Sequence, residues 1–413
     1  MWAEAFVVGV AAVRHLGRPA FHRPAVGTAI IWVMVDVVVI GGGIVGCAVA
    51  GHLASSGRTV ILVEQSAVGA GASGRNSGVV QHPFDPVLVA LHEQTLSLYR
   101  ALPPSEGIDF TLPDLPAGLL MISHDADLVR DQAAALAVSH PKLHAAFLAP
   151  GDVSALEPAL AEDVAAVRFD IGYPVAPEVA TNAYAAWALA SGVELRIGHA
   201  ARPWHAAGTT RGVVLDDGSR IEAADVVVAA GPWSPALVDP SGAWRPIRAL
   251  WGVVVEATVA DAPRHVVEEA EADLEPGAAD EPATHAFSIV TAIGRSTIGS
   301  TFLAVEPDPV AELPVILARA RTFVPRLDDT AQLGRLRVCA RPLSQDGRPL
   351  IGPIPGIDGL WIAAGHGPWG IPTGPAAGPM LVRAMDGQPD AIPAALDPGR
   401  FGPVPPPSTS GPS

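Results

Sequence analysis

Apolar runs and polar turns alternate near the amino end of the chain in the order strand, helix, strand. Residues 35–40 form a short apolar run, residues 44–56 have the spacing of a helix, and residues 59–63 form a second apolar run. Continuous apolar runs of this length are typical of strands buried on both faces, and a helix between two of them makes a βαβ unit. The pattern predicts one half of a Rossmann-type nucleotide-binding domain.

Further along the chain, this parallel-sheet pattern alternates with a second, more antiparallel one. The second pattern comprises a strand at 115–122, a helix at 126–137, and β-rich segments at 251–257, 286–291 and 296–302. The first pattern returns in a helix at 177–191, short strands at 193–197 and 212–215, and apolar runs at 225–230 and 360–364. After the last run a helix ends near residues 386–387.

We therefore expect an α/β fold with a Rossmann-like domain and a discontinuous α+β domain built on an antiparallel or mixed sheet. The Rossmann-like domain is assigned residues 34–113, 151–245 and 336–397, and the second domain residues 114–150 and 246–335. The acidic segment 268–281 is expected to be a solvated surface loop, with a mobile lid as the alternative.

Both ends of the chain lie outside these patterns. Basic residues break up the first segment, so no run of about 18 apolar residues could span a membrane. The basic cluster also follows the first apolar run, which is the reverse of a secretory signal. We expect residues 1–33 to be an extension outside the fold, with a membrane-associating leader as the alternative, and residues 398–413 to be a disordered tail.

Composition excludes several classes of function. The chain has 413 residues, enough for two lobes that share a cleft, and its net charge of −16 argues against a nucleic-acid partner. Cys47 and Cys339 are the two cysteines, too few for a disulfide framework or a zinc site. They suit a reducing compartment, so we expect a cytoplasmic protein that needs no metal. Lys142 is the only lysine, which leaves Schiff-base chemistry almost without a candidate.

The first turn carries a dinucleotide-binding motif. Gly41, Gly43 and Gly46 form G-x-G-x-x-G directly after a strand and at the start of a helix. One glycine makes the turn, one lets the backbone approach a pyrophosphate, and one lets helix and strand pack closely. Glu64 ends the second strand, where a carboxylate can bind ribose hydroxyls. The alternative is a glycine-rich turn in an ordinary βαβ unit.

A second loop of small residues favours FAD over NAD. Residues 71–78 read GASGRNSG, which is long enough to wrap a larger cofactor and includes Arg75 for a phosphate.

With these segments in view, the sequence resembles the D-amino acid oxidase-like flavoproteins, a family that includes glycine oxidase, sarcosine oxidase and D-amino acid dehydrogenase. The likeness runs from about residue 35 to 387 in four segments: DVVVIGGGIVG with Glu64, GASGRNSG, ADVVVAAGPWS at 224–234, and RPLSQDGRPLIGPIPGIDGLWIAAGHGPWG at 341–370. It implies an FAD-binding domain and a substrate domain.

The resemblance implies a set of FAD contacts in five parts of the chain. They are Gly41, Gly43, Ile44, Val45, Gly46, Glu64 and Gln65; Ser73, Gly74, Arg75, Asn76, Ser77 and Gly78; Val179 on the adenosine side; Gly231 and Trp233; and Gly365, His366, Gly367, Trp369, Gly370 and Ile371 along the isoalloxazine ring. A glycine loop before a helix can present N–H groups to the flavin edge where negative charge collects on reduction.

The resemblance also places Arg341 beside the flavin as the clamp for a substrate carboxylate. A planar guanidinium suits a carboxylate bidentately, and a surface ion pair is the alternative because the usual leading glycine is missing from CARP at 339–342. Trp251, Trp369 and His366 are candidate pocket walls, or else packing residues, and no catalytic proton transfer is assigned to His366.

Two further expectations concern Cys339 and the electron acceptor. In monomeric sarcosine oxidase a cysteine at the matching place is bonded to the flavin, so a covalent flavin at Cys339 is one reading and a small core residue the other. That enzyme uses a lysine to help oxygen react, and here the matching stretch reads STIG at 296–299. Oxygen, a quinone or a carrier protein therefore all stay open as acceptors.

The implied reaction is hydride transfer from the carbon that bears the amine to flavin N5, followed by hydrolysis of the imine. The expected substrate is a small amine or amino acid. Alternatives are a hydroxy acid, glycerol phosphate or N-methylated amine on the same fold, a flavin-binding subunit with little turnover, and a nicotinamide dehydrogenase.

Overall fold

The computed structural model describes residues 34–206, 208–270 and 284–405. The expectations for residues 1–33, for most of the acidic segment and for residues 406–413 lie outside these residues. Within them, sixteen of the eighteen strands form two large sheets.

The first sheet is the Rossmann-type one, and it draws strands from the beginning, middle and end of the chain. β1 (Val35–Ile40) pairs in parallel with β2 (Val60–Glu64) on one side and with β11 (Arg220–Val228) on the other. β8 (Glu194–Ile197) extends the sheet beyond β2, and β18 (Leu360–Ala364) extends it beyond β11. β17 (Leu350–Pro353), β9 (Ala201–Ala206) and β10 (Thr209–Leu215) add antiparallel pairs.

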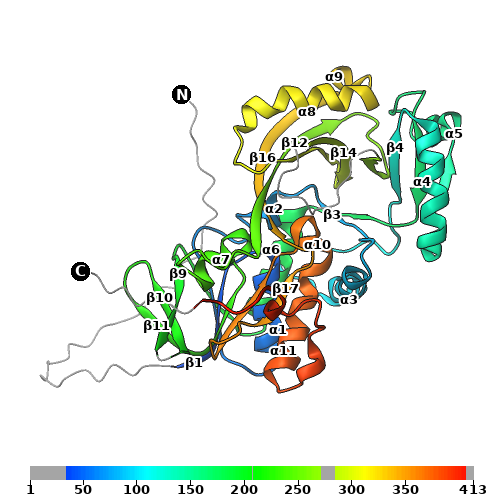
Figure 1. The fold of residues 1–413 in the computed structure, drawn as a ribbon. Helices are drawn as coiled ribbons and strands as arrows, with labels where there is room; N and C mark the ends of the chain where they lie inside the picture. The colour runs from blue at the N-terminus through cyan, green and yellow to red at the C-terminus, as the bar shows by residue number, and fades with distance from the viewer. Residues whose placement is uncertain (1–33, 207, 271–283, 406–413) are drawn as a thin grey trace, which may run out of the picture. The chain divides into compact units, whose positions relative to one another are not determined.

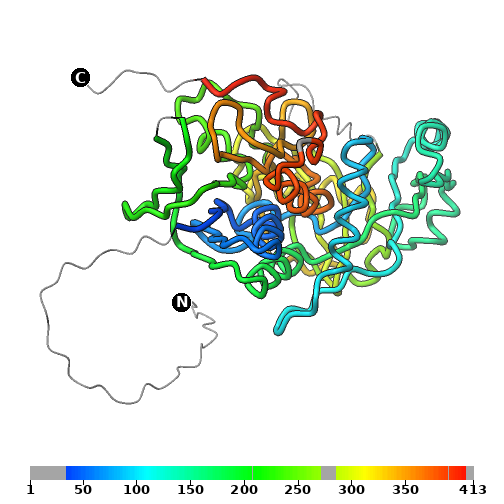
Figure 2. Tube along the Cα trace, turned by 90° about the horizontal axis from the view of Figure 1, so that it is seen from below, coloured from blue at the N-terminus to red at the C-terminus, as the bar shows by residue number. Residues whose placement is uncertain are grey.

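Helices from distant parts of the chain pack together against this sheet. α1 (Ile44–Ser55) contacts both α6 (Pro177–Ala190) and α11 (Ala377–Met385), and Figure 2 shows the blue start of the fold beside its orange-red end. At Gly51 of α1 an added Cβ would lie 2.4 Å from the ring of Trp187 in α6, so the two helices approach as closely as a glycine permits.

The second sheet has the order β16-β12-β15-β14-β13-β4-β6-β5. Its strands are β4 (Leu119–Ser123), β5 (Ala146–Leu148), β6 (Ala165–Phe169), β12 (Ile247–Val259), β13 (Val266–Glu269), β14 (Thr284–Ala292), β15 (Arg295–Phe302) and β16 (Ala331–Ser344). One face is covered by α8 (Pro309–Phe323), as Figure 1 shows, with Phe287 stacked on Phe323. The other face is free of that helix and carries Arg341.

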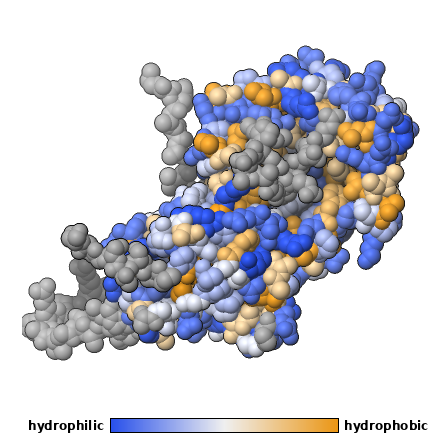
Figure 3. Space-filling model, viewed as in Figure 1, coloured by the Kyte–Doolittle hydropathy of each residue, from blue (hydrophilic) through white to orange (hydrophobic). Residues whose placement is uncertain are grey.

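Shorter elements complete the described chain. The helices are α2 (Ala72–Arg75), α3 (Pro86–Ala101), α4 (Ala126–Ser139), α5 (Pro150–Leu156), α7 (Ser234–Val238), α9 (Leu327–Thr330) and α10 (Gly370–Thr373). β3 (Val79–Val80) pairs with β7 (Tyr173–Pro174), and 3-10 turns include η2 (Gly231–Trp233) and η3 (Gly367–Trp369). No described helix has both the length and the apolar character that crossing a membrane requires. On the face shown in Figure 3, apolar side chains are scattered among polar ones.

Several boundaries differ from the sequence-based expectation. β6 was assigned with residues 151–245 to the Rossmann-like domain, and it pairs instead with β4 and β5 in the second sheet. β16 crosses the expected boundary at 336 and stays in the second sheet to Ser344. An apolar run shows that a strand is buried but does not show which partner it pairs with, which explains both differences.

The acidic segment and the carboxyl end also differ. Glu268 and Glu269 belong to β13 and not to a surface loop. Pro398–Phe401 forms a 3-10 turn in the range expected to be a disordered tail, and Arg400 Nε donates to Asp346 at 2.7 Å. That ion pair ties the turn to the body of the protein.

Candidate cofactor and substrate site

The glycine turn after β1 is shaped by two close backbone approaches. Gly41 has φ +115°, and an added Cβ would lie 2.5 Å from the carbonyl oxygen of Ala229. An added Cβ at Gly46 would lie 1.9 Å from the carbonyl oxygen of Gly41. Only glycine meets both conditions, because the first needs positive φ and the second needs helix and turn in direct backbone contact.

Two side chains organise the start of α1. Glu64 at the end of β2 accepts hydrogen bonds from the N–H groups of Gly42 at 2.7 Å and Ser66 at 2.8 Å. Ser73 Oγ accepts from the N–H of Ile44 at 3.0 Å, which brings the second small-residue loop over the helix start. The first turn of α1 has no acidic side chain, so its positive end can receive an anion.

The second loop is itself fixed by internal contacts. Asn76 Nδ2 donates to the carbonyl oxygens of Ala72 and Ser73, each at 2.9 Å, and Asn76 Oδ1 accepts from Gly78 N–H at 2.9 Å. An added Cβ at Gly74 would lie 2.5 Å from the carbonyl oxygen of Gly69. Arg75 is exposed and its Nη1 lies 3.4 Å from the carbonyl oxygen of Val338 in β16. The loop therefore joins the two sheets.

The glycine loop after β18 holds one histidine in a defined tautomer. His366 is 1% exposed, and its Nδ1 lies 2.9 Å from Thr373 Oγ1. The Thr373 hydroxyl donates its one hydrogen to the carbonyl oxygen of Trp369 at 2.6 Å, so Nδ1 must carry the ring proton. Burial lowers the pKa of His366 to about 3. Nε2 is thus a neutral, buried acceptor without a partner among the described residues.

Arg341 is a buried cation that has no acidic partner in the part of the chain that the structure describes. It is 8% exposed, and Nη1 donates to the carbonyl oxygen of Thr301 at 2.9 Å while Nη2 donates to Ser300 Oγ at 2.5 Å. Its guanidinium carbon lies 4.5 Å from the ring centre of Phe302. Burial lowers its pKa, and no carboxylate within the described residues pairs with it. A buried guanidinium in this state favours an anionic ligand, and it is not the surface ion pair that was the alternative.

Cys339 lies on the same face of β16, two residues before Arg341. It is 5% exposed, and burial raises the pKa of its thiol while the nearby Arg341, Arg337 and Arg75 favour the thiolate. Cys47 differs, because burial together with Glu64 raises its pKa to about 12. Both cysteines are free.

Comparison with known proteins identifies the class to which this geometry belongs. A family profile described as FAD dependent oxidoreductase matches residues 36–384. The chain belongs to this family. The match spans the glycine turn, the second loop, Arg341 and the glycine loop after β18.

Individual relatives agree with the family. The chain is 29% identical over 392 residues to a glycine oxidase of Pseudomonas aeruginosa, covering 89% of this chain and 98% of that one. It is 32% identical over 204 residues to a D-amino acid dehydrogenase of Rhizobium johnstonii, covering 48% and 45%. Among solved structures, glycine oxidase from Bacillus cereus has a TM-score of 0.74 at 24% identity, covering 86% and 95%. Iminodiacetate oxidase from a Chelativorans species has a TM-score of 0.72 at 24% identity, covering 88% and 99%.

The residues present fit FAD. Neither Gly41 nor Gly46 has room for a Cβ, and the first turn of α1 has no acidic side chain that would repel a diphosphate. His366 Nε2 is a buried acceptor left for a donor from outside the chain. Trp233 lies beside the second loop, since an added Cβ at Gly71 would be 3.9 Å from its ring, and Tyr99 Oη donates to the Ile371 carbonyl oxygen at 3.1 Å. We expect the residues named for FAD in these segments to hold it.

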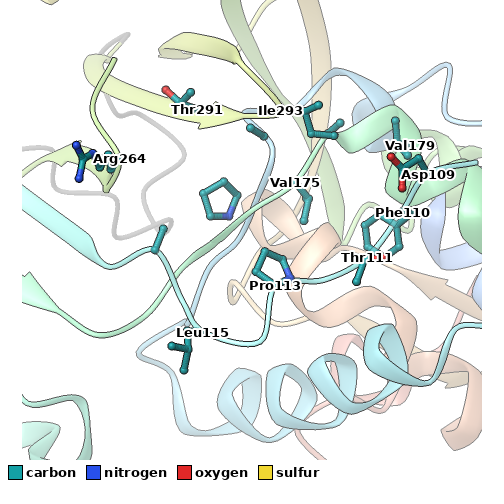
Figure 4. A pocket seen from close by; sticks show the side chains of 14 residues that line it. Asp109, Phe110, Thr111, Pro113, Leu115, Val175, Val179, Arg264, Thr291 and Ile293 are labelled. Carbon is teal, nitrogen blue, oxygen red and sulfur yellow. The ribbon is translucent and has the colours of Figure 1, made fainter. Parts of the chain in front are cut away.

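Trp251 lies on the other face of the second sheet from Arg341, whereas Val179 lies in α6 between two residues that approach the second loop: Thr181 Oγ1 donates to the Ser73 carbonyl oxygen at 3.2 Å, and an added Cβ at Gly74 would lie 3.1 Å from Glu178. Gly252 pairs with Cys339 and faces Arg341, so alternation along β12 turns Trp251 toward the opposite face of the sheet. Val179 lines a cavity of about 340 Å³ together with Phe110, Pro113 and Thr291, as Figure 4 shows. The sequence placed Trp251 near the substrate because it could not assign a sheet face, and the place of Val179 on the adenosine side stays a prediction.

Other contacts were missed from the sequence. Gly198 and His199 N–H donate to the carbonyl oxygen of Glu64 at 2.8 and 3.3 Å, which places the segment after β8 beside the end of β2. Ser300, Thr301 and Phe302 surround Arg341. These contacts arise from pairing between distant strands, and no local pattern signals them.

Proposed function

We propose that this FAD-dependent oxidoreductase oxidises a small amino acid or amine at its C–N bond, with Arg341 binding the substrate carboxylate. The observation that carries the proposal is the burial of the Arg341 guanidinium with two neutral partners and, among the described residues, no carboxylate. A substrate carboxylate would supply the missing charge bidentately. The glycine oxidase, D-amino acid dehydrogenase and iminodiacetate oxidase relatives support the same substrate class.

The protein contributes binding and orientation to this reaction. FAD, when bound, supplies the two-electron acceptor. Arg341 orients the carboxylate, the Phe302 ring packs against its guanidinium, and Nε2 of the neutral His366 is available to accept a hydrogen bond from a bound ligand. Holding the reacting atoms in a productive geometry supplies a large part of the rate of such a reaction without a catalytic base.

The test is anaerobic mixing with a panel of small amines and amino acids while the absorbance of the oxidised flavin is followed. We expect an amino acid to bleach the flavin, and we expect Arg341→Ala to raise KM at least tenfold with flavin content unchanged. Arg335→Ala on the same strand is the control, because Arg335 is exposed and already paired with Glu178 at 2.8 Å. If no compound bleaches the flavin and Arg341→Ala changes nothing, the protein is a flavin-binding subunit with little turnover.

Hydroxy acids and N-methylated amines are added to the same panel to test the alternative substrates. If a hydroxy acid bleaches the flavin and its amino analogue does not, the substrate is a hydroxy acid, and the role proposed for Arg341 is unchanged. The electron acceptor is proposed to be oxygen, a quinone or a carrier protein, and reoxidation of the bleached flavin by air separates the first from the other two. The two free, buried cysteines support a cytoplasmic location.

A covalent link between Cys339 and the flavin is a separate proposal. Its support is the position of the thiol on the face of β16 that carries Arg341, with three arginines favouring the thiolate. Acid precipitation tests it, because yellow colour that stays in the supernatant contradicts the bond and colour in the pellet that Cys339→Ser abolishes supports it.

A further inference from the structure

Glu268 and Arg341 lie on the same face of the second sheet, although they are on strands at different places in its order. Glu268 pairs with Ser288, Ser288 with Gly299, Gly299 with Val254, and Val254 with Arg337. Directly paired residues share a face, and so do residues four apart on one strand, so the series places Glu268 with Arg341. This is the face opposite to α8.

Glu268 is a partly enclosed carboxyl without a basic partner in the described part of the chain. Its pKa is raised to about 7 by burial, and a hydrogen bond from the Gln81 side chain is the one effect that favours its charged form. Neighbouring buried acids are paired: Glu269 binds Arg319 Nε at 3.0 Å, and Glu157 contacts His265 Nδ1 at 2.6 Å. Glu268 therefore carries a desolvation cost that no other described residue offsets with an opposite charge.

Gln81 adds a second free acceptor at the same place. It follows β3, three residues after Gly78 of the second small-residue loop, and it is 6% exposed. Its Oε1 has no hydrogen-bond donor among the described residues, and an added Cβ at Gly172 would lie 2.8 Å from it. The Glu268 carboxylate receives a hydrogen bond from the Gln81 side chain and has further lone pairs, and Gln81 Oε1 has no donor among the described residues. Together these oxygens match a ligand that donates several hydrogen bonds.

We propose that Glu268 and Gln81 form a subsite for a side-chain ammonium of the substrate whose carboxylate is bound by Arg341. This inference rests on the proposed function. The Arg341 guanidinium is bonded to Ser300 and Thr301 of β15, and β15 is two strand spacings, or about 10 Å, from the β13 strand of Glu268. The group at Glu268 is thus far from the carboxylate, and a basic amino acid such as lysine or ornithine fits better than one with a short side chain.

Kinetics with matched substrates test the subsite. Flavin reduction is compared for lysine and norleucine, each as both enantiomers, because the two share the same carbon chain and only lysine carries the terminal ammonium. We expect the native protein to prefer lysine at least tenfold in KM, and Glu268→Gln to abolish this preference by raising the KM for lysine alone. If the ratio of the KM for norleucine to the KM for lysine is the same in the native protein and in Glu268→Gln, the proposal is overturned.

Binding without turnover separates this proposal from the proposed function. Calorimetry compares 6-aminohexanoate with hexanoate, which share a carboxylate and differ in the distal ammonium. We expect the native holoprotein to bind 6-aminohexanoate at least tenfold more tightly and Glu268→Gln to bind both alike; equal binding to the native protein overturns the subsite. If this discrimination is present while no amine bleaches the flavin, the subsite stands and the proposed oxidation fails.

Glu269→Gln is the control, because the Glu269 carboxylate binds Arg319, and its loss should affect stability without changing the preference for 6-aminohexanoate over hexanoate.

Discussion

Gly252 and Arg341 face each other on neighbouring strands so closely that a Cβ added at Gly252 would lie 2.4 Å from both terminal nitrogens of the guanidinium. The space for the arginine is therefore made by the absence of a side chain on β12. Gly252 is a positioning residue for the group that we propose binds the substrate carboxylate.

Gly252→Ala should displace the Arg341 guanidinium without unfolding the sheet. The Cβ would meet the end of a side chain and not backbone, so the arginine can move, but its bonds to Ser300 and Thr301 would be lost or lengthened. We expect KM for a carboxylate substrate to rise about tenfold, equivalent to about 1.4 kcal/mol, with unchanged flavin content. Gly151→Ala is the control, since nothing lies within 4 Å of its added Cβ. An unchanged KM in Gly252→Ala would contradict the role given to this pair.

Gly46→Ala should remove the cofactor cradle. The added Cβ would lie 1.9 Å from the Gly41 carbonyl oxygen, so the start of α1 must move away from the turn that faces the diphosphate. We expect the ratio of flavin to protein, measured by absorbance, to fall at least tenfold. Gly57→Ala has open space around it and only the strain of φ +95°, so it should cost about 1 kcal/mol of stability and keep the flavin.

Glu268→Gln should stabilise the protein at alkaline pH. The folded-state pKa of Glu268 is raised from 4.5 to about 7, so the folded protein holds a proton more tightly than the unfolded chain, and stability is lost as pH rises through this range. Removing the titration should raise the free energy of unfolding above pH 7 by up to about 3 kcal/mol and leave it nearly unchanged at pH 4. Denaturant unfolding at several pH values measures this. A variant that is more stable yet loses its preference for lysine would be typical of a binding residue.

Buried histidines should make the protein sensitive to acid. Burial lowers the pKa of His52 and of His92 to about 4, and that of His366 to about 3. The unfolded chain therefore binds more protons between these values and the ordinary 6.5, and the free energy of unfolding should fall as pH decreases through that window. His52→Leu should weaken this dependence, because the His52 ring lies against Trp187 with an unpartnered Nε2. His144→Asn, at an exposed residue with φ 50°, should leave the dependence unchanged.

Local pattern was sufficient for the elements whose signals lie close together in the chain. The run at 35–40, the glycines from Gly41 to Gly46 and the acid at Glu64 predicted β1, α1 and β2 within one residue at each end, because turn, helix start and strand are each specified by neighbouring residues. The family followed from four such segments, and the profile match confirmed it.

Tertiary structure alone decided which face and which partner each residue has. The sequence could name Arg341 but not its burial against Ser300 and Phe302, and it placed Trp251 near the substrate although alternation turns it away. Glu268 read as part of a solvated acidic loop, and it became a candidate subsite only when β13 paired with β14. Strand pairing joins residues far apart in sequence and depends on the combined packing of the whole sheet, so no local pattern specifies it.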